Sequence, residues 1–373
     1  MKKFKKLVIL DKIILSDGQW SVLRNLAEEI IEYDGLTYKQ VIQKLEIEQI
    51  RKGKSKDVCF TEFAVEYTSE EELNRRLSGA DAVITCWTNI PDKVTLSNPQ
   101  LRYIGFWTNL VSHRINLDLA KKKNIVVTYI PDYGTIAVAE YVFALILEMS
   151  RRVAKQAKDT MSGKWPYELL KTALYVPNVT DINYHTLCGR KLGIIGLGRI
   201  GQQVAKIAEG FGMEIAYFSE HHKEDWEKRG VKYLMLNDLM KWSDIVTVHL
   251  SPYAGATPSL ISVDEGVQKN DLQEAFISKE NIALLKTGSI FINTSAGRLI
   301  DEDALLNEAE SGRIQVILDV YKSNPDRKRI QKIIQKYGEG RNIFTFRGGW
   351  LTQESIIRKG ESLISNIKEF LNN

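Results

Sequence analysis

Cysteine and proline are scarce in this sequence, which has three cysteines and eight prolines among its 373 residues. The cysteines stand at positions 59, 86 and 188. Their odd number and wide separation exclude a disulfide framework, and they show none of the close spacings of a metal site. We therefore expect no metal and, because free cysteines persist in reducing compartments, a cytoplasmic protein.

An excess of charge of one sign is also missing. The 51 basic and 47 acidic residues leave a net charge of +4, which argues against a nucleic-acid-binding surface. No run approaches the roughly 20 apolar residues that span a bilayer. The short apolar run at 7–10 is broken by Asp11 and Lys12, as in a first strand rather than a signal peptide. The sequence predicts neither a nucleic-acid nor a membrane partner.

What is present is typical of a globular α/β protein. Hydrophobic residues make up 44% and charged residues 26% of the chain, and its length exceeds what one core normally holds, so two domains are expected. Short apolar runs at 7–10, 81–87 and 101–106 alternate with a helical pattern near 19–33. This alternation predicts a small α/β domain with a parallel sheet, and a further strand-like run follows at 124–128.

Residues 136–150 show a helical pattern that is apolar on nearly every side. A surface helix would show a single apolar stripe of about 100°, so this helix has to be covered all round. A subunit interface, and hence a homodimer, is the interpretation that we favour. A buried internal helix is the alternative.

A glycine-rich turn organises the second half of the chain. Residues 192–195 form an apolar, strand-like run, and Gly196, Gly198 and Gly201 follow at GxGxxG spacing before a helical pattern. The first glycine allows a tight turn, the second admits a pyrophosphate, and the third lets helix and strand pack closely. We therefore expect dinucleotide binding through these glycines and the intervening Arg199 and Ile200.

Further strand-like runs occur at 214–218, 244–250, 289–294 and 315–320, with helical spacers between them. Together with the glycine turn they predict a doubly wound Rossmann domain. The stretch 251–280 is longer than one crossover loop requires, which favours a lid or an interaction surface.

Seven segments occur in the order found in the D-isomer-specific 2-hydroxyacid dehydrogenase family, and the chain from about 81 to 355 resembles that family. The segments are residues 101–105, 133–140, 192–201, 243–250, 292–295 with 301–302, 318–320 and 348–350. The resemblance implies an NAD-binding Rossmann domain at 116–349, with a dimerisation helix at 136–150. It places this domain inside a smaller flavodoxin-like substrate domain at 1–115 and 350–373, with an active site in the cleft between the two.

The family works with an arginine that anchors the substrate carboxylate, a glutamate, and a histidine that passes the proton accompanying hydride transfer. At the matching positions this sequence has Ala296, Asn324 and Phe346. Loss of a general acid/base alone costs about 10²- to 10⁴-fold in rate, and loss of the arginine leaves a bound carboxylate without its bidentate partner. The resemblance therefore favours the family's fold but disfavours ordinary 2-hydroxyacid oxidation.

Three nearby residues are candidates for the missing catalytic roles. Arg298 lies two positions after Ala296 and Arg347 lies one after Phe346, so either guanidinium could enter the cleft from a shifted backbone position. His113 belongs to the loop that replaces the family's glycine-rich carboxylate-binding segment, and it could act as an acid or base. The alternative for each is a solvent-exposed surface residue.

The choice of cofactor depends on the end of the second Rossmann strand. That strand ends at Phe218 rather than at the aspartate of many NAD-linked members, but Glu220 stands two residues later. A carboxylate there accepts hydrogen bonds from the ribose and repels a 2′-phosphate, which favours NAD over NADP. The matched motifs place five further residues near the cofactor: His249, Thr294, Ser295, Ala296 and Asp319.

An intact glycine motif beside altered catalytic positions predicts an NAD-dependent oxidoreductase that acts on a specialised small-molecule substrate. A catalytically silent NAD-binding sensor or partner subunit is the alternative. A third hypothesis is an enzyme that retains its cofactor while it oxidises and re-reduces one substrate internally.

Overall fold

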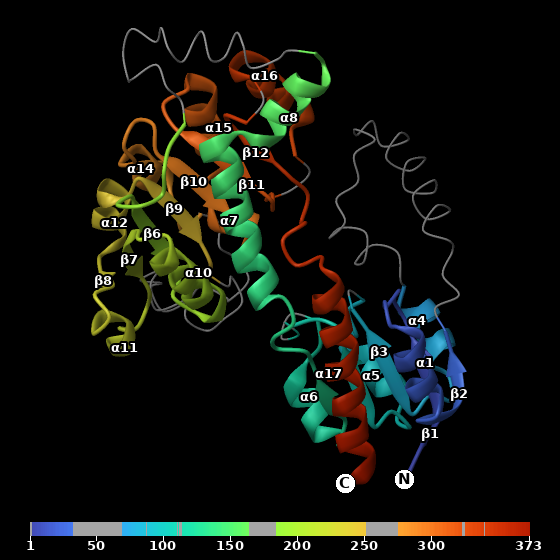
Figure 1. The fold of residues 1–373 in the computed structure, drawn as a ribbon. Coiled ribbons are helices and arrows are strands. Elements are labelled where there is room, and N and C mark those ends of the chain that lie inside the picture. The colour runs from blue at the N-terminus through green and yellow to red at the C-terminus, as the bar shows by residue number, and fades with distance from the viewer. Residues whose placement is uncertain are drawn as a thin grey trace, which may run out of the picture. The chain divides into compact units, whose positions relative to one another are not determined.

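The computed structural model describes residues 2–32, 69–86, 88–109, 111, 114–163, 184–250, 275–322, 325–338 and 340–373. The chain forms two compact units, Met1–Tyr133 with Thr352–Asn373, and Gly134–Leu351. Each unit contains a parallel sheet with helices on both of its faces (Figure 1). The predicted α/β class with two Rossmann-like domains is therefore confirmed.

The first unit has a five-stranded sheet in the order β2-β1-β3-β4-β5. One face packs on α1 and α17 and the other on α4, α5 and α6. Because both faces are covered, β3, β4 and the second half of β1 are buried at every residue instead of alternating between buried and exposed positions. The elements are β1 Phe4–Ile9, α1 Asp17–Arg24, β2 Ala27–Ile31, α4 Glu70–Leu77, β3 Ala82–Thr85, α5 Asp92–Ser97, β4 Tyr103–Phe106, α6 Leu117–Lys122, β5 Val126–Thr128 and α17 Gln353–Asn372.

The helix expected near 19–33 is shorter, and a strand takes its second half. A capping box at Ser16 starts α1, which ends at Arg24. The following Ala27–Ile31 forms β2, which pairs in parallel with β1. The expectation was wrong because backbone pairing along the edge of β1 outweighs the local helical pattern of this stretch.

The chain passes from the first unit to the second after Tyr133 and returns at Thr352. The sequence expectation put these crossings at 115/116 and 349/350. In the structure α6 and β5 belong to the first unit, because β5 pairs with β4 and extends its sheet. Residues 116–133 are therefore part of the first unit rather than of the second.

The second unit has a seven-stranded parallel sheet in the order β12-β11-β10-β9-β6-β7-β8. The order reverses between β9 and β6, as in a doubly wound Rossmann domain. Its elements are α7 Thr135–Arg151, α8 Val153–Met161, β6 Lys191–Ile195, α10 Arg199–Gly210, β7 Glu214–Phe218, α11 Glu224–Glu227, β8 Lys232–Tyr233, α12 Leu236–Trp242, β9 Ile245–Val248, α14 Lys279–Ala283, β10 Ile290–Asn293, the 3₁₀ turn η2 Gly297–Leu299, α15 Glu302–Ser311, β11 Gln315–Leu318, α16 Arg327–Tyr337 and β12 Ile343–Phe344.

Helix α7 covers one face of this second sheet together with α10 (Figure 1). Ile146 is fully buried there, and Phe143 stacks on Phe211, the residue after α10, with ring centroids 5.3 Å apart. The other side of α7 leaves Ile136 47% and Leu147 36% exposed. Packing within the unit therefore covers one side of this helix, and the homodimer stays a prediction for the other.

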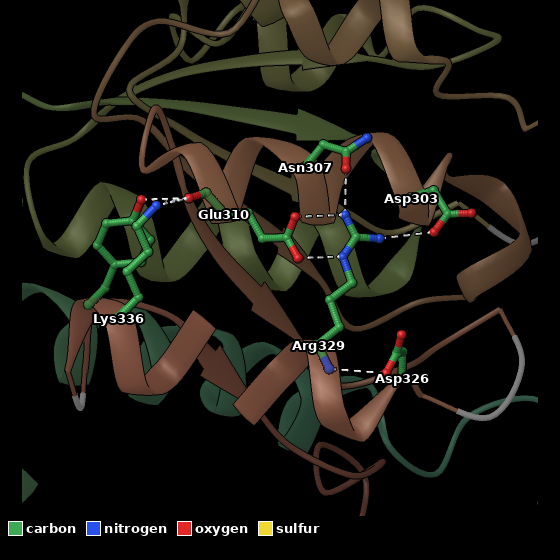
Figure 2. Close-up of polar contacts among 7 residues, drawn as sticks. Asp303, Asn307, Glu310, Asp326, Arg329 and Lys336 are labelled. Carbon is green, nitrogen blue, oxygen red and sulfur yellow. Dashed lines mark hydrogen bonds and ion pairs between the residues drawn. The ribbon is translucent and has the colours of Figure 1, made fainter. Parts of the chain in front are cut away.

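An arginine joins α16 to α15 on the opposite face of the second unit. Arg329 donates to Glu310 over 2.8 Å, to Asn307 over 2.6 Å and to Asp303 over 3.1 Å, all on α15 (Figure 2). Its backbone N–H donates to Asp326, the N-cap of α16. The hydrogen bond to Glu310 raises the pKa of this guanidinium, which therefore stays charged. The charged hydrogen bonds from Arg329 connect α16 to α15.

Some predictions lie outside the described part of the chain. These are the segment 251–280 for its greater part, and the single residues His113 and Asn324. In the ranges that the structure describes, no helix combines the length and the apolar character needed to cross a membrane.

Candidate functional site

The turn between β6 and α10 needs two of its glycines for close packing. Gly196 has a φ of 99°, and a Cβ there would lie 2.9 Å from backbone atoms of His249 and Leu250. A Cβ on Gly201 would lie 2.2 Å from the carbonyl oxygen of Gly196. Any side chain at either position would therefore push the turn away from the sheet or from the helix.

Packing within the protein does not require a glycine at position 198. A Cβ at this position would meet no atom within 4 Å, and the residue is the N-cap of α10 without a side-chain cap hydrogen bond. The first helical residues, Arg199 and Ile200, place their backbone N–H groups beside this open space at the positive end of the helix dipole. The turn thus fits a dinucleotide pyrophosphate, which binds at such a helix N-terminus.

The carboxyl end of β10 adds a polar group to the same edge of the sheet. Thr294 buries its hydroxyl oxygen, which has no hydrogen-bond partner among the residues that the structure describes. Ser295 beside it donates its N–H to Asn293 over 3.0 Å and its hydroxyl to the carbonyl of Leu250. Because Leu250 also flanks Gly196, the end of β10 and the glycine turn form one continuous site. A buried hydroxyl without a partner here is a second feature that fits a bound cofactor.

Glu220 stands on an ordered loop just beyond the end of β7. Its side chain is 19% exposed and lies 4.0 Å from the Nε2 of His221. Tyr217 fixes this loop, since its hydroxyl donates to Glu227 and accepts from the N–H of Lys223, both over 2.6 Å. Burial, with the contact to Glu227, raises the pKa of Tyr217 to about 12, so the phenol stays a hydrogen-bond donor at every working pH.

His249 directly follows the end of β9. Its Nε2 lies 3.0 Å from the hydroxyl of Thr247, and burial lowers the pKa of the imidazole to about 3. The ring is therefore neutral near pH 7. It can line a cofactor site, but it is not matched to proton exchange at that pH.

Asp319, at the end of β11, organises the loop after β12. Its carboxylate accepts hydrogen bonds from the hydroxyl of Thr345 over 2.8 Å and from the backbone N–H groups of Gly348 and Gly349 over 2.9 and 3.3 Å. Its carbonyl accepts from the N–H of Arg347 over 2.8 Å. Both carboxylate oxygens bind this loop, so the structure gives Asp319 a positioning role within the chain.

The ends of β10 and β12 lead to the residues that the sequence matched to the family's catalytic arginine and histidine. Phe346 is 66% exposed, and Arg347 after it has a φ of 48°, the left-handed region. Ala296 is partly buried, and Arg298 lies exposed in the 3₁₀ turn η2. All four follow strand ends at the carboxyl edge of one sheet, where open α/β sheets bind their ligands.

A second polar cluster lies at the carboxyl edge of the first unit's sheet, where no sequence motif predicted one. Asp11, after β1, accepts hydrogen bonds from the hydroxyl of Thr85 over 2.6 Å and from the N–H groups of Cys86 and Thr88 over 2.6 and 3.0 Å. The carboxylate thereby fixes the turn after β3.

Lys359 of α17 reaches the same edge and is only 2% exposed. It belongs to the buried side of its helix together with Ser355 and Leu363, at a spacing of four. This spacing could have indicated from the sequence that Lys359 is buried. A lysine within the apolar stripe of an amphipathic helix is buried only when its charge is compensated.

Comparison with known proteins decides the family. The model of the D-isomer specific 2-hydroxyacid dehydrogenase NAD binding domain matches residues 143–265 and 266–335. The chain belongs to the D-isomer specific 2-hydroxyacid dehydrogenase family. The match begins within α7 and ends within α16, so the second unit carries the NAD-binding domain of this family member, and NAD is its cofactor.

Three known proteins illustrate the similarity. The chain is 30% identical over 316 residues to the hydroxypyruvate reductase of Blautia hydrogenotrophica, covering 84% of this chain and 89% of that protein. It is 32% identical over 263 residues to the glyoxylate reductase of Thermococcus litoralis, covering 68% and 70%. The D-lactate dehydrogenase of Aquifex aeolicus, solved with NAD and lactic acid, shares the fold with a TM-score of 0.68 at 23% identity, covering 99% of this chain and 96% of that one.

Proposed function

We propose that this family member is an NAD-dependent oxidoreductase with an atypical active site, acting on a specialised small-molecule substrate. The observation that carries the proposal is an open cradle at Gly198 beside strand ends that hold Ala296 and an exposed Phe346. Methyl and phenyl groups offer no hydrogen bond to a carboxylate and no titratable proton. Binding of the cofactor is thus retained while the usual residues for chemistry are absent.

The cofactor-binding residues follow from the same cradle. The N–H groups of Arg199 and Ile200 would hold the pyrophosphate, and the buried Thr294 hydroxyl would supply a hydrogen bond at the end of β10. Gly196 and Gly201 keep the turn tight, and His249, Ser295, Ala296 and Asp319 complete this edge. Glu220 would accept hydrogen bonds from the adenosine ribose and repel a 2′-phosphate, which favours NAD over NADP. Bound NAD would supply the hydride donor or acceptor.

Arg298, Arg347 and His113 are the candidates for the remaining catalytic roles. A guanidinium keeps its charge at every working pH, so either arginine suits stabilisation of an oxyanion rather than proton exchange. The left-handed backbone of Arg347 supports its assignment, because strained residues cluster at functional sites. His113 would exchange the proton.

The relatives named hydroxypyruvate reductase and glyoxylate reductase act, by their names, on 2-oxo acids. We extend the proposal to a substrate with a carbonyl or hydroxyl group next to a carboxylate. We also propose that the protein is a homodimer and that it is cytoplasmic. The exposed apolar residues of α7 support the homodimer, and the scattered cysteines support the cytoplasm.

The test incubates the purified full chain with NADH and a panel of 2-oxo acids that extends from glyoxylate to branched and aromatic compounds. Loss of NADH absorbance with one bulky member, together with slow reaction of the small acids, is the expected result. Tight NADH binding without oxidation by any member would overturn the proposal in favour of the silent sensor. Turnover of a substrate without net NADH consumption would instead indicate the internal redox cycle.

A further inference from the structure

A short loop follows β7 and begins beside the glycine turn. It comprises residues 219–223 and leads from β7 into α11. At its start, the carbonyl of Phe218 accepts a hydrogen bond from the N–H of Gly196 over 2.8 Å. Glu220, which the proposed function assigns to the adenosine ribose, is the second residue of this loop. The conformation of the loop therefore decides where the Glu220 carboxylate stands.

The far end of the loop is fastened by a tyrosine of the preceding strand. The hydroxyl of Tyr217 accepts a hydrogen bond from the N–H of Lys223 and donates one to the carboxylate of Glu227 in α11, both over 2.6 Å. The same oxygen of Glu227 lies 2.9 Å from the Nδ1 of His222. Two adjacent loop residues, His222 and Lys223, are thus tied to one pair of a hydroxyl and a carboxylate.

Aromatic packing holds this pair in place. Tyr233 of β8 is the register partner of Tyr217, and the two rings meet edge to face with centroids 5.4 Å apart, a favoured geometry for aromatic pairs. The ring of His222 lies against that of Tyr233, with centroids 3.9 Å apart. Because Tyr217 is also fully buried, its hydroxyl is a fixed point to which the loop is bound.

The charges of the pair suit a lasting contact. The hydrogen bond from Tyr217, followed by that with His222, lowers the pKa of Glu227, so this carboxylate is charged near pH 7. Burial, with the contact to Glu227, raises the pKa of Tyr217 to about 12, so the phenol keeps the proton that it donates. Hydrogen bonds to a charged acceptor are stronger than those between neutral groups. Both partners therefore have at neutral pH the protonation states that a strong hydrogen bond needs.

A fixed loop matters for a carboxylate that discriminates between two cofactors. The carboxylate accepts hydrogen bonds from a ribose, or repels a 2′-phosphate, only where it is held close to that ribose. A loop that became ordered only on binding would lose conformational entropy, and a loop that is fixed beforehand avoids this cost. Loosening the loop should therefore weaken the binding of NAD and relax the exclusion of NADP.

We propose that Tyr217 and Glu227 are positioning residues that hold the loop 219–223, and with it Glu220, in the conformation that selects NAD over NADP. The inference rests on the proposed function, which assigns Glu220 to the ribose. It goes beyond that function by naming two residues that act on the cofactor through the loop. Neither of them lies in the seven segments that carry the family resemblance.

The experiment measures the dissociation constants of the full chain for NADH and for NADPH by the fluorescence of the reduced nicotinamide. The readout is the ratio of the NADPH constant to the NADH constant, because a substitution that only loosens the fold weakens both cofactors alike. Tyr217→Phe removes the hydroxyl and keeps the buried ring. Glu227→Ala removes the acceptor from a side chain that is 33% exposed, and it replaces Tyr217→Phe if thermal unfolding shows that variant to be unfolded. The control is Tyr233→Phe, since the Tyr233 hydroxyl donates to the sulfur of Met235 instead of to the loop.

The unchanged chain should bind NADH at least about 100-fold more tightly than NADPH. Tyr217→Phe and Glu227→Ala should each lower this ratio at least about fivefold, because Glu220 is then no longer held beside the ribose. Tyr233→Phe should keep the ratio within about twofold of the unchanged chain.

A double substitution tests whether Tyr217 acts through Glu220. Glu220→Gln alone should bring the ratio close to one, since an amide has no charge that repels a 2′-phosphate. Adding Tyr217→Phe to Glu220→Gln should then change the ratio by less than about twofold. A further fall by the same factor as in the single variant would mean that the two residues act independently, which contradicts the proposal.

An unaltered ratio in folded Tyr217→Phe, or in Glu227→Ala where that variant is needed, would overturn the proposal. Equal binding of both cofactors by the unchanged chain would overturn it too. If Tyr217→Phe lowers the ratio but no 2-oxo acid oxidises NADH, the positioning role stands and the proposed function fails. If NADH is oxidised and the ratio is unaltered, the function stands and the positioning role fails.

Discussion

At the scale of single residues, the proposed function assigns cofactor binding and chemistry to different positions of the second unit. Gly196 and Gly201 are required by backbone contacts inside the turn, whereas Gly198 faces open space. Ala296 and Phe346 stand at strand ends of the same sheet and offer neither charge nor proton. The proposal therefore leads to two predictions, one about cofactor binding and one about turnover.

The first prediction concerns Gly198. A valine at this position should leave the fold intact, because no protein atom lies within 4 Å of its Cβ. Its branched side chain would fill the space beside the first N–H groups of α10, so NADH affinity should fall by at least about 100-fold from the micromolar range. Calorimetry measures the affinity and thermal unfolding checks the fold. Gly210→Ala, in open space at the other end of α10, is the control and should bind normally.

The second prediction concerns turnover of simple 2-hydroxy acids and 2-oxo acids. D-lactate, D-glycerate, glyoxylate and hydroxypyruvate should react at least ~10³-fold more slowly than in an enzyme with a kcat near ~10 s⁻¹. A developing alkoxide would have no imidazole at position 346 and no guanidinium at 296, and each loss raises the barrier.

Steady-state kinetics with NAD or NADH measure these rates. Ordinary turnover of any of the four acids would contradict the prediction and would mean that Arg298, Arg347 or His113 has taken over the missing roles. Single alanine substitutions at those three positions would then identify which residue it is.

At the scale of elements, long-range backbone pairing and charged contacts decide what short patterns leave open. The stretch after Arg24 has a helical pattern, yet it becomes β2 because β1 offers a parallel partner. Similarly, α16 is largely polar, with Ile333 as its buried residue. Its attachment therefore depends more on charge than on apolar burial.

A third prediction follows for the contact between α15 and α16. Arg329→Met should lower the free energy of unfolding by about 1–2 kcal/mol, because four side-chain hydrogen bonds to α15 are lost while the partners remain partly exposed to water. Chemical denaturation measures the change, which should shrink in high salt. Lys328→Met removes an exposed charge next to it and should change stability by less than about 0.5 kcal/mol. Equal effects of both substitutions would remove the special role of Arg329.

At the scale of the whole molecule, the exposed side of α7 bears on whether the protein is a homodimer. Helix α7 buries one side in its own unit and leaves Ile136 and Leu147 exposed on the other. A dimer through this side would remove that apolar surface from water.

The fourth prediction is that the full chain is a homodimer at micromolar concentration. The double substitution Ile136→Glu with Leu147→Glu should convert it to a monomer, because like charges would face each other across a two-fold interface. Light scattering measures the mass. Val153→Glu together with Met161→Glu, on exposed residues of α8, is the control and should remain dimeric. A monomeric unchanged chain would assign α7 to internal packing alone.

The sequence by itself determined the two-unit α/β architecture, because continuous apolar runs identify buried parallel strands and GxGxxG spacing identifies the turn. It also placed Ala296 and Phe346 within recognisable motifs, on which the proposal of an atypical active site rests. The assignment of single residues to the cofactor site and to the catalytic roles stays a prediction. His113 and Asn324 lie outside the described residues, so their places rest on the sequence alone.

Only the tertiary structure decided the features that depend on residues far apart in the chain. Pairing with β1 converted an expected helix into β2, and pairing with β4 moved residues 116–133 into the first unit. Cation–π contacts of Lys359 join the C-terminal helix α17 to Trp107 and Tyr133, which lie more than 200 positions earlier in the chain. A local sequence pattern shows which side of a helix is buried. The residues that pack against that side come from distant segments, so only the fold decides them. For Lys359 these residues include the rings of Trp107 and Tyr133.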